Sequence, residues 1–95
     1  MKIVRDVFQA KYGRGDELVA LFKEFQKIGA ELSTMRILTD ASGPFFTVVT
    51  EYEVESLAAW EEQIATTFSN PDFGSFFSRM IPLVETGRRE FYNVE

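Results

Sequence analysis

The fold is decided by residues 32–54, LSTMRILTDASGPFFTVVTEYEV, in which two segments of high β-propensity flank a turn. The segments are residues 32–41 and 45–54, and Ser42-Gly43-Pro44 between them is typical of a chain reversal. The stretch therefore predicts two antiparallel strands joined as a hairpin.

A strand and a helix are expected before the hairpin. Residues 2–12 are rich in β-branched and aromatic types and predict a first strand, which Gly13-Arg14-Gly15 ends. Asp16 is the expected N-cap of a helix that stops at Gly29. The apolar residues between them recur at helical spacing and predict one buried stripe: Leu18, Leu21, Phe22, Phe25 and Ile28.

A broken helix and a last strand are expected after the hairpin. Ser56 suits the N-cap of a helix whose apolar stripe, Leu57, Trp60, Ile64 and Phe68, is expected to join the core. Asn70-Pro71 then breaks the helix, which restarts with Phe73, Phe76, Phe77 and Met80. Residues 82–87 are expected to interrupt the regular structure again, and residues 88–94 alternate as a strand.

The order βαββαβ predicts one α+β domain over residues 1–95, with a ferredoxin-like fold and a four-stranded antiparallel sheet. Two helices can cover only one face of such a sheet. The other face, on the order of 500 Å² from strand spacing and rise, exceeds what a monomer usually leaves apolar. A second copy is its natural cover, which predicts a homodimer joined through sheet faces, a dimeric α+β barrel.

Composition excludes several functions. The net charge of −5 disfavours nucleic acid and anionic lipid as partners, and no apolar run is long enough for a membrane span or a signal peptide. We therefore expect a soluble, cytoplasmic protein. Cysteine and histidine are both absent, which removes the thiolate, the imidazole base and the usual zinc and haem ligands, so no metal or cofactor is expected.

Polar residues on the uncovered face form the candidate ligand site. If the hairpin loop has an even number of residues and residue i of one strand faces residue 85 minus i of the other, Glu51 is expected to face Thr34 and to lie diagonal to Arg36. The candidates that line the barrel interior are Arg5, Gln9, Arg36, Thr47, Glu51, Arg89 and Asn93, although the sequence does not fix which face the first and last strands present. The alternative is that Arg36 and Glu51 only form an ion pair. Without histidine, Glu51 or a tyrosine is the most credible proton carrier.

Two longer stretches carry a family resemblance. Residues 42–63, SGPFFTVVTEYEVESLAAWEEQ, and 82–94, PLVETGRREFYNV, resemble the dimeric α+β barrel superfamily and within it NIPSNAP-like proteins. The resemblance implies a ferredoxin-like fold and a homodimer. Superfamily members include cofactor-free monooxygenases, haem-dependent enzymes and small-ligand binders, but this chain lacks the histidine that haem-using relatives employ as an axial ligand. NIPSNAP-like members offer no established catalytic motif to match.

Three functional hypotheses follow. The first is a small homodimer that binds a small hydrophobic or aromatic molecule in the inter-sheet barrel. The second is a cofactor-independent enzyme, a monooxygenase or an isomerase, acting on a substrate bound there. The third is a structural protein that serves as a partner for another protein.

Overall fold

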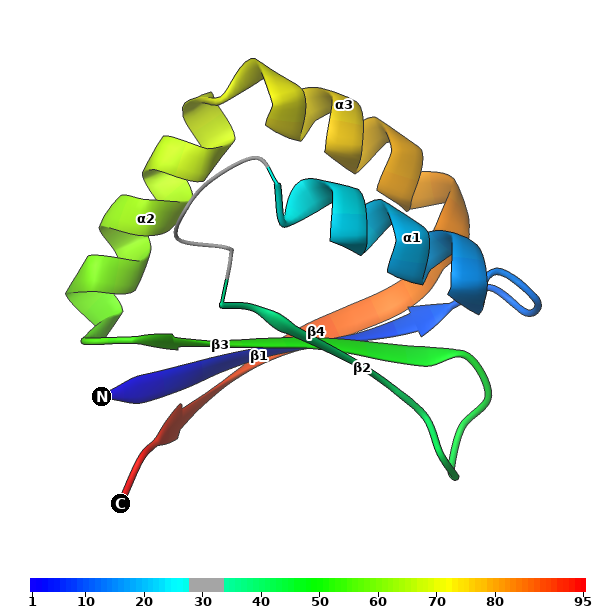
Figure 1. Ribbon diagram of the computed structural model, residues 1–95, viewed down its shortest axis with the longest axis horizontal. Helices are drawn as coiled ribbons and strands as arrows, with labels where there is room; N and C mark the ends of the chain where they lie inside the picture. The colour runs from blue at the N-terminus through cyan, green and yellow to red at the C-terminus, as the bar shows by residue number, and fades with distance from the viewer. Residues whose placement is uncertain (28–33) are drawn as a thin grey trace.

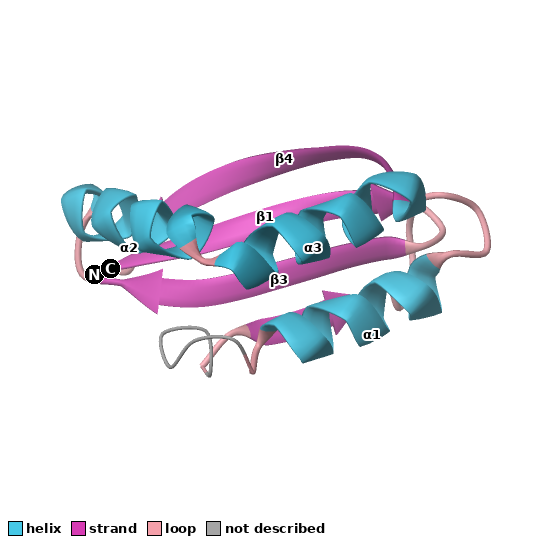
Figure 2. Cartoon of the chain, turned by 90° about the horizontal axis from the view of Figure 1, so that it is seen from above, coloured by secondary structure: helices cyan, strands magenta, loops and turns pink. Residues whose placement is uncertain are grey.

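The computed structural model describes residues 1–27 and 34–95, and its centre is a four-stranded antiparallel sheet. The strands are β1 (Lys2–Ala10), β2 (Arg36–Thr39), β3 (Thr47–Val54) and β4 (Val84–Asn93). Their order across the sheet is β2-β3-β1-β4, with β1 between its two non-sequential neighbours (Figure 2). This is the ferredoxin-like arrangement, and the predicted fold class is confirmed.

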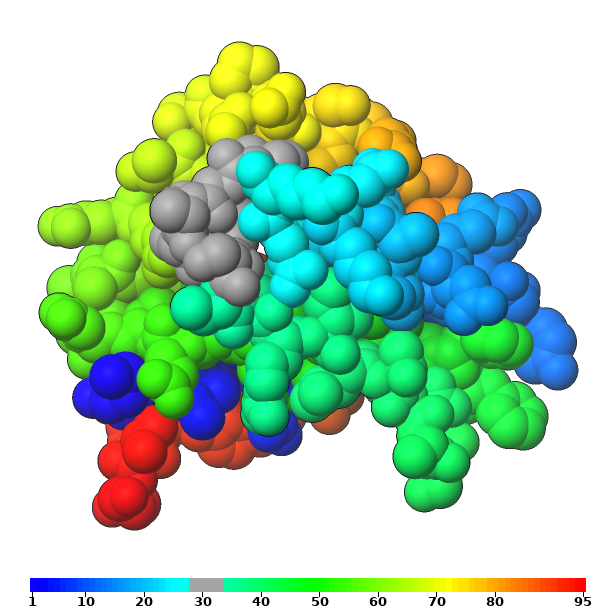
Figure 3. Space-filling view, in the orientation of Figure 1, coloured from blue at the N-terminus to red at the C-terminus, as the bar shows by residue number. Residues whose placement is uncertain are grey.

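All described helices lie on one side of the sheet (Figure 1). They are α1 (Gly15–Phe25), α2 (Leu57–Ser69), α3 (Pro71–Met80) and the short 3-10 helix η2 (Ile81–Leu83). The sheet face turned away from them is called the open face. The β2–β3 turn and the C-terminal end project from the body on that side (Figure 3). Within the described ranges, no helix is long and apolar enough to cross a membrane.

The core lies between α1, α3 and the sheet. The predicted stripe of α1 is buried as expected, with Leu18, Leu21, Phe22 and Phe25 between 0% and 9% exposed. Ala10, Val48 and Phe76 complete the cluster from β1, β3 and α3. Ile28, Gly29 and Leu32, which the sequence placed in the first helix and at the hairpin start, lie outside the described residues.

Helix α1 begins two residues earlier than predicted. Arg14 is its N-cap residue and gives no side-chain cap, so the assignment of Asp16 as N-cap is wrong. Asp16 lies in the first turn, where a carboxylate still interacts favourably with the helix dipole. A Cβ at Gly15 would come within 3.1 Å of the Phe46 ring, so glycine lets the helix start pack against the hairpin.

The hairpin register differs from the expectation by two residues but keeps its faces. Arg36, not Thr34, is directly opposite Glu51. The difference arises at the turn, where Phe46 has a φ of 60° and the Asp40 carboxylate accepts a hydrogen bond from the Thr47 amide at 3.0 Å. The centre of the hairpin loop therefore lies one residue further along the chain than expected. Because the register shift of two residues is even, each side chain remains on its expected face.

Two expectations for the second half of the chain are wrong. Residues 82–87 do not interrupt the structure throughout, because β4 already begins at Val84 and pairs with the whole of β1. The stripe of α2 is not core: Leu57 is 47% exposed and Phe68 57% exposed, and Trp60 is only half-buried. Helix α2 rises steeply from the sheet to meet α3 at Pro71, as Figure 1 shows, so its C-terminal end stands away from the strands, while Trp60 near its start still packs on Phe91 of β4.

Candidate functional site

The space under the raised helices is a cavity of about 200 Å³, which we call the sheet–helix cavity. Side chains from β1, β3 and β4 form its floor, and side chains from α1, α2 and α3 form its walls and roof. Most are apolar, and the residues used below are Asp6, Phe8, Phe22, Phe25, Tyr52, Gln63, Thr67, Phe68, Phe73, Phe76 and Arg89. A cavity of this kind excludes water around a bound molecule and is the usual form of a small-molecule site.

The break at Asn70-Pro71 creates the roof. The Ser56 hydroxyl accepts a hydrogen bond from the Ala59 amide at 3.0 Å and fixes the start of α2. The Asn70 side chain accepts from the Asp72 amide at 2.9 Å, and Pro71 occupies the first turn of α3, where it needs no amide hydrogen. The predicted cap at Ser56 and the predicted helix break at Asn70-Pro71 are both confirmed. Two separately capped helices meeting at an angle leave room beneath their junction, which a single straight helix would fill.

Aromatic rings form most of one end of the cavity. Phe25 stacks on Phe76 with ring centroids 4.1 Å apart, and Phe68 packs against Phe73 at 4.8 Å. Phe8 and Phe22 lie 5.1 Å apart on the floor side. Phenylalanine has only two side-chain torsions and these rings hold one another, so this wall is preorganised for a flat apolar molecule.

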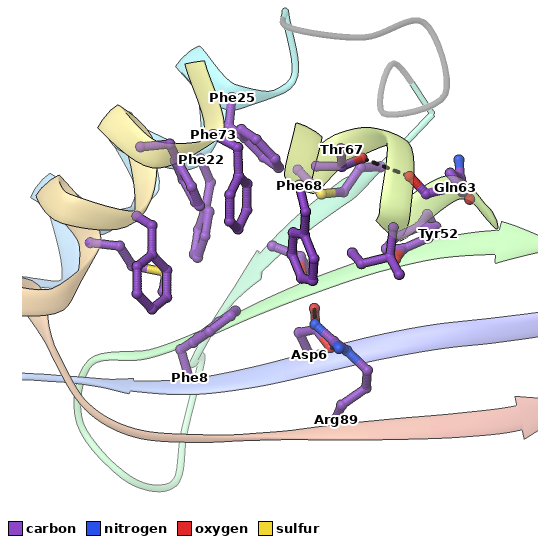
Figure 4. A pocket seen from close by; sticks show the side chains of 16 residues that line it. Asp6, Phe8, Phe22, Phe25, Tyr52, Gln63, Thr67, Phe68, Phe73 and Arg89 are labelled. Carbon is purple, nitrogen blue, oxygen red and sulfur yellow. Dashed lines mark hydrogen bonds and ion pairs between the residues drawn. The ribbon is translucent and has the colours of Figure 1, made fainter. Parts of the chain in front are cut away.

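Polar side chains gather at the other end. The labelled residues there in Figure 4 are Asp6, Tyr52, Gln63, Thr67 and Arg89. Arg89 donates two hydrogen bonds to Asp6, from Nε to Oδ1 at 2.7 Å and from Nη2 to Oδ2 at 3.2 Å. The hydrogen bond from Arg89 to the Asp6 carboxylate, opposed by burial, raises the Arg89 pKa. This end therefore holds a charge-balanced pair with fixed geometry.

Tyr52 is held in place by Trp60 behind it. Trp60 Nε1 donates to Tyr52 Oη at 2.8 Å, and the Arg89 guanidinium lies 5.0 Å from the centroid of the Trp60 ring. Burial raises the pKa of the Tyr52 hydroxyl, while the hydrogen bond from Trp60 acts in the opposite direction. The Tyr52 hydroxyl is therefore a neutral phenol at physiological pH.

A second cluster lies on the open face. Glu51, only 4% exposed, accepts hydrogen bonds from Arg5 and from Arg36. The Arg5–Glu51 ion pair measures 2.7 Å between Nη2 and Oε2. The hydrogen bond from Arg36 lowers the Glu51 pKa most, burial opposes it, and Arg5 lowers it further. The carboxylate is thus satisfied within one chain, as the ion-pair alternative from the sequence requires.

The seven candidate residues divide between the two faces. Arg5, Gln9, Arg36, Thr47 and Glu51 share the open face, and Thr47 Oγ1 donates to Gln9 Oε1 at 3.3 Å. Arg89 pairs in register with Asp6 and lines the sheet–helix cavity instead. Asn93 has the parity of Arg89 and accepts a hydrogen bond from Lys2 at the sheet end. A ligand site between two sheets stays a prediction, with five of its residues on one face.

The open face itself carries a hollow beside Glu51. It measures about 570 Å³ and is open to solvent, with Ile3, Thr34, Arg36 and Glu53 among its lining residues. It is larger than the sheet–helix cavity, but it is a wide depression with charged walls. Among residues 1–27 and 34–95, no group of three or more acidic side chains is arranged to hold a metal ion.

Sequence reasoning missed most of the polar end. Asp6 was not singled out, and neither were Gln63 and Thr67 of α2. A signal was present at Asp6, because a charged residue between Val4 and Phe8 interrupts the apolar side of a strand that packs under helices. Thr67, 8% exposed, gave no comparable signal since its neighbour Thr66 is of the same type.

Comparison with known proteins places the chain by fold. No protein-family model matches the chain, and no curated protein is similar to it in sequence. Among solved structures, an uncharacterized NIPSNAP domain protein from Burkholderia xenovorans has a TM-score of 0.85 and 17% identity, with 100% of this chain and 95% of that chain covered. A NIPSNAP family protein from Agrobacterium tumefaciens has a TM-score of 0.88 and 15% identity, with 99% and 85% covered.

A third similar structure has a different description. It is a putative antibiotic biosynthesis monooxygenase from Deinococcus radiodurans, with a TM-score of 0.71 and 15% identity, and the match covers 100% of this chain and 93% of that chain. At these identities the likeness shows a shared fold. It confirms the resemblance to NIPSNAP-like proteins at the level of architecture.

Proposed function

We propose that this protein is a homodimer that binds a small hydrophobic or aromatic molecule in the sheet–helix cavity. The observation that carries the proposal is a cavity of about 200 Å³ with a phenylalanine wall at one end and a fixed polar group at the other. An apolar cavity of about 150 Å³ is enough to admit benzene. The volume therefore suits a molecule of one aromatic ring with a short substituent.

The choice of this cavity differs from the inter-sheet location expected from the sequence. Charged side chains line the hollow on the open face, where a bound apolar molecule would gain little from burial. The apolar walls of the sheet–helix cavity offer such a molecule about 25 cal/mol for each Å² that it withdraws from water. The single Trp60, bonded to Tyr52 of the cavity, also provides a built-in fluorescence reporter.

A threonine pair provides the test of the cavity. Thr67 is buried against the cavity, whereas Thr66 is exposed on the same helix, and each hydroxyl donates to the carbonyl four residues earlier, at 3.0 and 3.1 Å. Titration of the wild type with ethylbenzene, followed by calorimetry and Trp60 fluorescence, is expected to show saturable binding. Thr67→Phe should abolish this binding by filling the cavity, and Thr66→Phe should retain it. Equal binding by both variants would place the ligand elsewhere.

The homodimer is proposed on the composition of the open face. Apolar side chains of Ile3, Val7, Leu38 and Val49 share this face with arginines that form ion pairs within the same chain, two of them with Glu51 and one with Glu90. A face with internally paired charges can be covered by a second copy without leaving an isolated buried charge. A second copy would also enclose the hollow beside Glu51.

Sedimentation equilibrium tests the dimer. Val49 faces Val7 at the centre of the open face, so Val49→Glu is expected to give a folded monomer. Leu57→Glu, on the helix side of the molecule, is the matched control and should remain dimeric. A wild-type monomer at micromolar concentration contradicts the proposed assembly.

A second candidate function is a cofactor-independent monooxygenase or isomerase. Two observations favour it: the fold shared with the monooxygenase-like structure from Deinococcus radiodurans, and the presence of Tyr52, whose phenol can donate a proton, among the residues that line the apolar cavity. Oxygen uptake with methylhydroquinone, a single-ring substrate that suits the cavity volume, tests the oxygenase form. Uptake that Tyr52→Phe and Tyr92→Phe reduce equally would argue against a role for the cavity. A net charge of −5 also disfavours nucleic acid and anionic membrane surfaces as partners. The cytoplasmic location expected from the sequence stays a prediction.

A further inference from the structure

The polar end of the sheet–helix cavity has a defined hydrogen-bonding capacity. Tyr52 Oη accepts the Trp60 indole hydrogen at 2.8 Å, and among the described residues the Tyr52 hydroxyl donates to no acceptor. A phenol carries one hydrogen to donate. Because the Trp60 bond fixes the oxygen and occupies an acceptor site, the remaining function of this hydroxyl toward a ligand is to donate.

The charges at the polar end of the cavity are balanced by the Asp6–Arg89 pair. Among the described residues that line the cavity, Arg89 is the cation, and both of its bonds to Asp6 run between the edge of the guanidinium and the carboxylate. One face of that guanidinium lies over the Trp60 ring at 5.0 Å. A ligand anion entering here would meet an arginine that is already neutralised, and it would lose its hydration without a compensating charge.

We propose that the cavity selects a neutral aromatic molecule bearing a carbonyl oxygen, with the Tyr52 hydroxyl donating the hydrogen bond to that oxygen. This proposal rests on the proposed function and adds the chemical class of its ligand. The aromatic ring lies against the wall formed by Phe8, Phe22 and Phe73, and the carbonyl points to the end where Tyr52 and Gln63 lie. A carbonyl is a pure acceptor, so it matches the donor that the Trp60 bond leaves available.

Two probes of nearly equal shape separate the two proposals. Acetophenone carries the carbonyl, and α-methylstyrene replaces its oxygen by a methylene group. Calorimetric titration of the wild type should show acetophenone binding about fivefold more tightly, the usual range for one net hydrogen bond. If both bind with equal affinity, the carbonyl inference is wrong while the proposed function stands. If neither binds, the proposed function fails, and the carbonyl inference with it.

The tyrosine variants locate the hydrogen bond. Tyr52→Phe should bring the affinity for acetophenone down to that for α-methylstyrene and leave the latter unchanged. Tyr92→Phe is the matched control, since Tyr92 belongs to the open face and its hydroxyl donates to Glu90 at 3.0 Å. A fivefold preference that survives in Tyr52→Phe would overturn the role of this hydroxyl.

Charge provides an independent test of the neutral ligand. Benzoate has the size of acetophenone and should bind the wild type more weakly. Asp6→Asn releases Arg89 from its counter-ion, so this variant is expected to gain affinity for benzoate and to keep that for acetophenone. Tighter binding of benzoate than of acetophenone by the wild type would show that the polar end accepts an anion, and would overturn the proposal.

Discussion

Replacing Glu51 by glutamine removes the carboxylate that lies between two guanidinium groups. The Glu51 side chain is only 5% exposed and accepts from both Arg5 and Arg36. Hydrogen bonds to charged groups contribute about 1.5 to 3 kcal/mol each. Because the two arginines are 39% and 68% exposed, water screens them and replaces part of what they lose. We therefore expect a net loss of about 2 kcal/mol in the free energy of unfolding.

Urea unfolding followed by circular dichroism measures this loss, at one fixed protein concentration because an associated protein unfolds in a concentration-dependent way. In a thermal scan the same change lowers the Tm by about 10 °C for a domain of this size. Glu53→Gln is the matched control, since Glu53 is exposed on the same face of β3. The control should unfold like the wild type.

The pH dependence of stability tests whether the ionised Glu51 carboxylate causes the difference between the two proteins. The folded-state pKa of Glu51 is lowered, chiefly by the hydrogen bond from Arg36. Its contribution to stability is therefore complete above the pKa of the unfolded carboxyl group and is lost as the pH falls through the folded-state pKa. The difference between the wild type and Glu51→Gln should shrink below about pH 4. Equal stability of the two proteins at pH 7, or a difference that stays constant on acidification, would refute the reasoning.

Three further substitutions, each with its expected change in the free energy of unfolding in urea, test the packing, helix cap and ion pair around the cavity. Val48→Ala, at a side chain only 1% exposed, should lower the free energy of unfolding by about 2.5 kcal/mol, whereas Val94→Ala, 50% exposed, should leave it unchanged. Ser56→Ala removes the cap of α2 and should cost about 1 kcal/mol, a loss that Ser56→Asp should not show. Arg79→Gln breaks an exposed pair with Glu24 and should have no measurable effect at physiological salt; a clear loss would mean that the pair is more shielded than its exposure indicates.

The architecture was predictable because the signals were local and consistent. The α1 stripe follows from apolar residues at helical spacing, and the hairpin around Gly43, the Ser56 cap and the break at Asn70-Pro71 each follow from a short local motif. Sheet faces were also predictable, because alternation needs only parity and the actual register shift of two residues preserves it. The exposed sheet area suggested a partner, which remains a proposal.

The site was less predictable because it depends on the angle between helices. Periodicity shows that Leu57, Trp60, Ile64 and Phe68 share one side of α2, but it cannot show how far that side stands from the sheet. A close approach would have made these residues core, and the observed tilt makes Ile64 and Phe68 walls of a cavity. The sequence also left open which face Arg89 presents, and the pairing of β4 with β1 brings it to Asp6.

The helices on either side of Asn70 contribute unequally to the apolar core. Helix α1 places four side chains in the buried apolar cluster and α3 places Phe76 there, whereas the buried residue of α2 among those described is the polar Thr67, which is not part of that cluster. Substitutions along α2 can therefore alter the shape and chemistry of the cavity at little cost to folding. A protein with this plan can acquire a new ligand by changing one helix, and a library confined to residues 57–69 is the direct way to redesign it.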